Sequence, residues 1–197
     1  MTSEFINKLL DELEKRGIRK NTIECILQEG SSLYLENPND LDFKVIVSYY
    51  NPKAETFNPI VIDGTAVECC FYTPRDWNRV CDYKKAYFIV ECPDMKCVYG
   101  DDSNFKRYDV LHDKNLQKYI INIYDKFLFN VDPNNKKIQP FKKKRLWNFL
   151  LFAYRIKNNS LEVTPTQLNT IQNAHDQKVE VESYQILFED VKKIVNA

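Results

Sequence analysis

The segment from Gln28 to Val47, QEGSSLYLENPNDLDFKVIV, limits the possible folds of this chain more than any other. A glycine followed by two serines, Gly30-Ser31-Ser32, predicts a turn after the strand-like run 23–27. In Asp40–Val47, polar and apolar residues alternate before the run becomes fully apolar, which predicts a strand with a buried far end. Because successive side chains of a strand point to opposite faces, Asp40, Asp42 and Lys44 are expected on one face.

Two carboxylates on one face of a strand repel each other unless a positive group lies between them. Asp40 and Asp42 therefore predict a hard cation, Mg²⁺ or Mn²⁺, which proteins bind with oxygen ligands. The turn at Gly30-Ser31-Ser32 offers backbone and hydroxyl donors that can bind phosphate. A phosphate-binding turn beside a metal-binding carboxylate pair is typical of phosphoryl or nucleotidyl transfer.

A metal site of this kind usually needs a third acid, which must come from a neighbouring strand. Asp63-Gly64 predicts a hairpin turn between the runs 59–62 and 65–71. Glu68 lies in the returning strand of that hairpin and could pair with the Asp40 strand, so it is the best candidate. Asp63 is the alternative, although its position before Gly64 already explains it as a turn residue. For Glu68, the alternative is an exposed place on an edge strand.

The order of these motifs resembles the nucleotidyltransferase superfamily, which has the fold of DNA polymerase beta and of the small aminoglycoside nucleotidyltransferases. The resemblance covers about residues 20–110. It is carried by Gly30-Ser31, then Asp40-Leu41-Asp42-Phe43, then Val67-Glu68-Cys69. Tyr99-Gly100-Asp101 is similar to a downstream segment that is common in the family.

The resemblance implies how the chain would bind a nucleoside triphosphate. Gly30 and Ser31 would hold the β- and γ-phosphates, and Ser32 would assist them. Lys44, on the same face as the aspartates, could contact the triphosphate, or it could simply neutralise the neighbouring acids.

The resemblance also implies a reaction. Asp40 and Asp42 would bind the Mg²⁺ or Mn²⁺ ion that bridges the triphosphate. Glu68 would help to bind a second metal ion and to deprotonate the acceptor hydroxyl. An NMP would then pass from an NTP to the acceptor, with release of pyrophosphate. The acceptor could be a small hydroxylated molecule, a protein side chain or a tRNA end.

The patterns along the chain predict an α+β fold: a nucleotidyltransferase-type mixed sheet of about four or five strands, flanked by helices and followed by a C-terminal helical bundle. We expect a catalytic core over residues 1–111 and a helical subdomain over 112–197. Helices are expected to end at Gly17 and to begin after Thr73, Asp113 and Thr164, and two more cover 146–154 and 184–195. The run 86–92 fits either a strand or a helix end.

Composition narrows the compartment and the partners. Lys and Arg together number 28, as do Asp and Glu, so no overall field draws the chain to nucleic acid or membrane. No apolar run is long enough to span a bilayer. The six cysteines contain no CxxC pair, and we interpret them as buried free thiols of a cytoplasmic protein.

Two other functions remain open. One is a catalytically inactive protein of the same fold that binds a protein or RNA partner; the complete set of acids argues against it. The other is a metal-dependent nuclease using Asp40, Asp42 and Glu68. A nuclease would not need the Gly-Ser turn.

Overall fold

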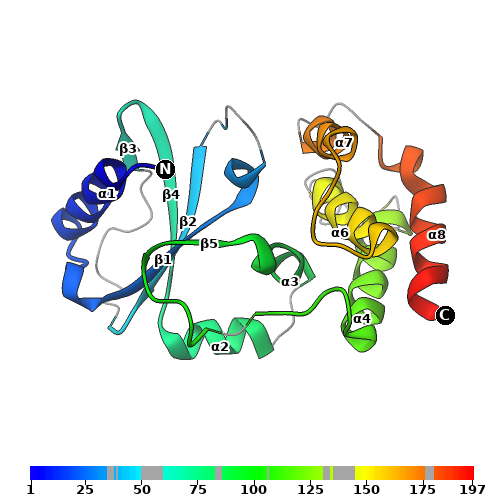
Figure 1. Cartoon of the computed structure of the whole chain (residues 1–197), viewed down its shortest axis with the longest axis horizontal. Helices are drawn as coiled ribbons and strands as arrows, with labels where there is room; N and C mark the ends of the chain where they lie inside the picture. Colours follow the sequence, from blue (N-terminus) through cyan, green and yellow to red (C-terminus); the bar gives the residue numbers. More distant parts are fainter. Residues whose placement is uncertain are drawn as a thin grey trace. The chain divides into compact units, whose positions relative to one another are not determined.

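The computed structural model describes residues 1–34, 38, 40–49, 60–82, 86–105, 107–130, 134, 145–175 and 180–197. The chain divides into two compact units. The first contains Met1–Lys84 and Asp94–Arg107, and the second contains Lys85–Pro93 and Tyr108–Ala197. Figure 1 shows the strands in the first unit and the C-terminal helices in the second.

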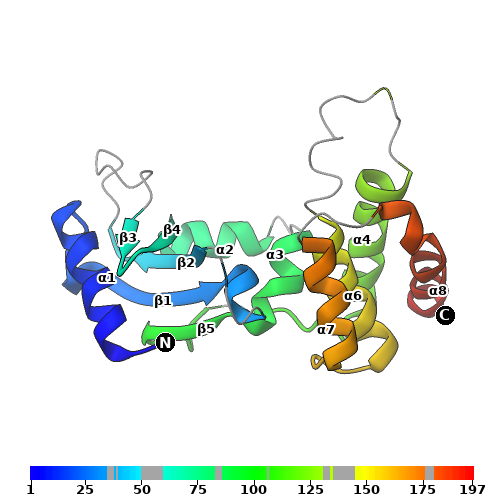
Figure 2. The same ribbon diagram turned by 90° about the horizontal axis from the view of Figure 1, so that it is seen from above.

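The first unit is built on a five-stranded sheet in the order β3-β4-β2-β1-β5. β2 and β4 are parallel, and the other neighbouring strands are antiparallel. Figure 2 shows β1 running between β2 and β5. The sheet is therefore mixed, which confirms the predicted α+β fold. The strands are β1 (Ile23–Glu29), β2 (Asp40–Val47), β3 (Ile60–Ile62), β4 (Thr65–Tyr72) and β5 (Lys96–Gly100).

Helix α1 (Ser3–Lys15) supplies much of the core of the first unit, beside β3 in Figure 1. Leu9 and Leu13 are fully buried and join Phe43 and Val45 of β2 in one apolar cluster. The apolar face of β2 thus packs on the core. The alternation in the sequence therefore leaves Asp40, Asp42 and Lys44 on the opposite face.

The hairpin predicted at Asp63-Gly64 is confirmed. β3 and β4 pair antiparallel, with Ile62 opposite Thr65. Asp63 and Gly64 have φ angles of 51° and 82°, as a two-residue turn that matches the twist of the strands requires. The Asp63 carboxylate also accepts hydrogen bonds from the Lys8 ammonium at 2.9 and 3.0 Å.

Helix α2 (Pro74–Asp82) begins where the sequence predicts. The Thr73 hydroxyl accepts a hydrogen bond from the Asp76 amide and donates one to its carboxylate, so each residue caps the other. Trp77 is fully buried, and its ring meets those of Tyr72 and Phe105 edge-on at 5.9 and 6.0 Å.

The regular elements in the described part of the second unit are all helices. The segment that fitted either a strand or a helix forms α3 (Ala86–Glu91). The other helices are α4 (Lys114–Tyr124), which continues as a π-helical turn (Asp125–Phe129), α6 (Leu146–Asn158), α7 (Pro165–His175) and α8 (Gln185–Asn196). Helix α6 packs against α7 and α8, and α4 packs against α8. Figure 2 shows α7 beside α6, and α8 beside α4.

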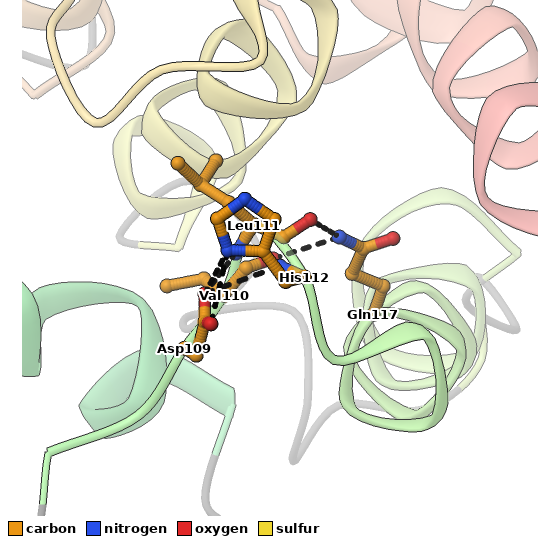
Figure 3. Close-up of polar contacts among 5 residues, drawn as sticks. All are labelled: Asp109, Val110, Leu111, His112 and Gln117. Atoms are coloured by element: carbon orange, nitrogen blue, oxygen red, sulfur yellow. Dashed lines mark hydrogen bonds and ion pairs between the residues drawn. The ribbon is translucent and has the colours of Figure 1, made fainter.

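The chain enters α4 through a short capped turn, drawn in Figure 3. The Asp109 carboxylate accepts a hydrogen bond from the His112 amide at 3.1 Å, and it lies 3.0 Å from Nδ1 of the His112 ring. The buried amide of Gln117 donates to the carbonyls of Val110 and Leu111. Asp113 is the N-cap of α4, as predicted.

The cysteine prediction was wrong in part. Cys25 and Cys92 are buried, but Cys70 and Cys97 are exposed, because they lie on the polar face of β4 and on the edge strand β5. The side chain of Cys81 lies outside the described residues. Within the described part of the chain, no helix has the length and hydropathy of a membrane span.

Candidate functional site

Three acidic residues form a row across the middle of the sheet. Asp42 on β2 lies opposite Glu29 on β1 and opposite Glu68 on β4. Directly paired residues on neighbouring strands project from the same face, roughly 5 Å apart. Asp40 projects from this face too, two positions before Asp42. We call Glu29, Asp40, Asp42 and Glu68 the acidic face.

The register places Glu68, rather than Asp63, beside the aspartate pair. Glu68 is exposed and lies directly opposite Asp42 in the parallel pairing of β2 and β4. Asp63 lies in the β3–β4 turn, where its carboxylate binds Lys8 of α1. The pairing of β4 with β2 therefore brings together the residues that the sequence suggested: Asp40, Asp42 and Glu68.

The turn that follows β1 approaches Asp42 very closely. Gly30 begins a 3₁₀ turn (Gly30–Leu33) and has a φ angle of 74°, which residues with a side chain rarely adopt. A Cβ atom at this position would lie 2.3 Å from Oδ2 of Asp42. Glycine is thus required here both by the backbone conformation and by the space that the Asp42 carboxylate occupies.

Hydrogen bonds from β1 hold Ser32 in this turn. The Ser32 hydroxyl donates to the backbone carbonyl of Glu29 and accepts from the Gln28 side-chain amide, each at 3.0 Å. The side chain of Ser31 lies outside the described residues. The predicted phosphate-binding turn is therefore next to the acidic face, with Gly30 in contact distance of Asp42.

The pKa of Asp42 reflects both its burial and the negative charges around it. Burial, together with the negative charges of Asp40, Glu29 and Glu68, raises the pKa of Asp42 from 3.8 to about 7, and Lys44 opposes this with a smaller effect. Negative charge on this face therefore exceeds what Lys44 compensates. A cation bound by the carboxylates would relieve the imbalance.

Lys44 forms a buried ion pair with Glu29. Its ammonium donates to Oε1 of Glu29 at 2.7 Å, and the two side chains are 7% and 13% exposed. The ammonium also lies 5.4 Å from the centre of the Tyr72 ring. Although burial lowers the pKa of Lys44, the negative charge of Glu29 leaves that pKa above its usual value.

Glu29 is a residue of this site that the sequence did not reveal. It directly precedes Gly30, in a run that predicts a strand, and nothing in the sequence near it specifies its partner. Its importance depends on the β1–β2 register, which places it opposite Asp42. The apolar alternation Cys25-Leu27 on the same side of β1 even favours a buried apolar residue at this position.

The donor set fits a hard divalent cation in its chemistry and its strand register. Asp40, Asp42 and Glu68 offer carboxylate oxygens on one face, and the like charges around Asp42 favour a bound cation. However, no three His, Cys, Asp or Glu side chains in the described part of the chain converge into a ready-made metal cluster.

Comparisons with known proteins find a match only among solved structures. No protein-family model matches the chain, and no curated protein matches it. Among solved structures, the chain is similar to spectinomycin adenyltransferase AAD(9) from Enterococcus faecialis, determined with ATP and spectinomycin. The two share 12% identity with a TM-score of 0.49, over 100% of this chain and 91% of that one.

Proposed function

We propose that the protein is a metal-dependent nucleotidyltransferase, which moves an NMP from an NTP to an acceptor hydroxyl and releases pyrophosphate. One observation supports this most strongly: Asp42 of the acidic face lies directly against the Gly30 turn, so closely that a Cβ at Gly30 would be 2.3 Å from its Oδ2. Transfer of a nucleotidyl group from a triphosphate needs a carboxylate-bound cation beside a phosphate-binding turn. A nuclease would need only the carboxylates.

Each residue has a part in the proposed reaction. Gly30, Ser31 and Ser32 bind the β- and γ-phosphates through their backbone amides, and the Ser32 hydroxyl holds the turn through its bond to the Glu29 carbonyl. Asp40, Asp42 and Glu68 would hold the divalent cation, which would supply positive charge beside the triphosphate.

The bond changes then follow from this arrangement. The acceptor oxygen attacks the α-phosphorus in line, and its proton passes to the Glu68 carboxylate. The bond between the α-phosphorus and the oxygen that bridges it to the β-phosphorus breaks, and pyrophosphate leaves. Lys44 takes no direct part in this scheme, because its ammonium is buried against Glu29.

We propose a small hydroxylated molecule as the acceptor, in preference to a tRNA end or a protein. The formal net charge is zero, with 28 basic and 28 acidic residues, whereas binding along a polynucleotide needs many uncompensated Lys and Arg residues.

The first test is calorimetric binding of ATP, GTP, CTP and UTP in the presence of Mg²⁺. We expect metal-dependent binding of at least one nucleotide by the wild type, and its loss in Asp40→Ala/Asp42→Ala. That nucleotide is then used as the donor in a screen of hydroxylated acceptors, with pyrophosphate release as the readout. A folded wild type that binds no nucleotide would refute the proposal and favour a partner-binding role.

A matched pair of variants tests the third acid. Glu68→Gln is expected to abolish pyrophosphate release while nucleotide binding survives, because Glu68 accepts the proton of the acceptor. Asp63→Asn removes an acid from the neighbouring hairpin turn and should leave the rate unchanged. The reverse pattern would assign the third acid to Asp63.

A further inference from the structure

Glu29 adds a fourth carboxylate to a face that already carries three. Burying a charged pair such as Glu29 and Lys44 costs solvation free energy, and the cost is offset only when the geometry is good. Here the bond is short, at 2.7 Å, and both side chains are almost completely buried. The fold therefore contains, within the acidic face, an ion pair whose burial costs solvation free energy.

Lys44 has a second acidic neighbour. Asp42 lies two positions before it on β2 and on the same face, and residues in this relation are roughly 7 Å apart along the strand. A lysine side chain is long enough to span that distance. Glu29 lies opposite Asp42 in the register, so it competes with Asp42 for the same ammonium.

We propose that Glu29 is a positioning residue of the acidic face: it holds the Lys44 ammonium toward β1, so that this ammonium does not occupy the Asp42 carboxylate and both Asp40 and Asp42 stay open to a divalent cation. This inference rests on the cation site of the proposed function. The Lys44 ammonium also lies 5.4 Å from the centre of the Tyr72 ring on β4. Without Glu29, Lys44 would turn to Asp42 and compete with the cation.

The test is Mn²⁺ binding, measured by calorimetry and by the electron paramagnetic resonance signal of free Mn²⁺, without nucleotide. We compare the wild type with Glu29→Gln, Lys44→Met and the double variant. Glu29→Gln is expected to weaken Mn²⁺ binding about 10- to 100-fold, as is typical when the partner of a metal-site residue is lost. The same change in the Lys44→Met background is expected to weaken binding much less, because only the through-space charge of Glu29 is lost and no ammonium competes for Asp42.

The dependence on Lys44 separates positioning from other roles. Equal losses in both backgrounds would overturn the inference, because Glu29 would then be a metal ligand or a structural residue in its own right. An unchanged affinity in Glu29→Gln would overturn it as well. If Glu29→Gln does not fold, the Lys44→Met background, which contains no ammonium at this position, still decides: a loss of about 10-fold or more there contradicts the inference.

Asp42→Asn separates this inference from the proposed function. Wild-type Mn²⁺ binding that is lost in Asp42→Asn establishes the cation site, whichever way the Glu29 comparison falls. A folded wild type that binds no Mn²⁺ would refute the cation site and the inference together.

Discussion

Asp42 binds a proton in the cation-free fold, at the same carboxylate that the proposed reaction needs for a cation. Its position on β2 places it between Glu29 and Glu68, where burial and like charges raise its pKa to about 7. In the absence of a cation, the folded protein therefore holds a proton on Asp42 near neutral pH, whereas the unfolded chain releases it near pH 4. Proton and cation compete for the same carboxylate.

Asp42→Asn is expected to stabilise the cation-free protein at pH 8. Between about pH 4 and pH 7 the folded wild type binds a proton that the unfolded chain has lost, so its stability falls as the pH rises. The asparagine variant lacks this decline. Its advantage in melting temperature should therefore be small at pH 4, grow up to pH 7 and then stay constant.

The measurement is a series of thermal melts of both proteins with a chelator present. An advantage that does not change with pH would show that Asp42 is not perturbed in the folded state. Added Mg²⁺ should reduce the difference in melting temperature at pH 8, because only the wild type has the Asp42 carboxylate that binds the cation and is stabilised by it.

At the scale of elements, the sequence predicted the strands better than their pairing. Alternation in Asp40–Val47 predicted β2 with its boundaries, since side-chain direction is a local property of a strand. The hairpin at Asp63-Gly64 was predictable because the turn preference of an Asp-Gly pair is a local property too. The sequence also suggested that β4 pairs with β2, but the parallel direction, the register and the place of Glu29 were not predictable, because they depend on packing between segments that lie far apart in the chain.

Two glycines with similar backbones serve as a test of the Gly30 turn. Gly30 and Gly64 have φ angles of 74° and 82°, but a Cβ on Gly64 would meet nothing within 4 Å, whereas one on Gly30 would reach Asp42. Gly64→Ala should cost only the backbone term, about 1–2 kcal/mol in free energy of unfolding. Gly30→Ala should lower the free energy of unfolding by about 1–3 kcal/mol more than Gly64→Ala, because the new Cβ overlaps the Asp42 carboxylate.

Urea unfolding measures both costs, and calorimetry with Mg²⁺ and nucleotide measures their effect on the site. Only Gly30→Ala is expected to weaken binding, because the Asp42 carboxylate must move. Equal effects of the two substitutions would contradict the close approach of the turn to Asp42.

At the scale of the whole molecule, the chain passes back and forth between its two units. The sequence predicted a boundary after residue 111, from the change in pattern near Asp109. Yet Lys85–Pro93 belongs to the second unit. Its helix α3 has Phe88, Ile89 and Val90 buried, and α6 binds it through Arg155, whose Nη1 donates to the Val90 carbonyl at 2.8 Å. A helix of six residues is too short for its apolar periodicity to indicate that it packs against α6.

A fragment containing residues 1–111 is therefore expected to fold poorly. It would carry α3 without α4 and α6, with the apolar side chains of α3 exposed to solvent. We expect oligomers in size-exclusion chromatography, and a shift to a 1:1 complex when residues 112–197 are co-expressed. A monomeric, cooperatively melting fragment that ignores the second piece would contradict this division of the chain.

The return of α3 to the second unit also sets an order of events on the ribosome. Translation proceeds at about 5–20 residues per second, and domains generally fold as units from the N-terminus. Helix α3 emerges before the last strand, β5, and long before α6, the helix that holds it through Arg155. For several seconds the nascent chain thus presents an apolar helix whose partners have not yet been made, which is the kind of segment that chaperones bind.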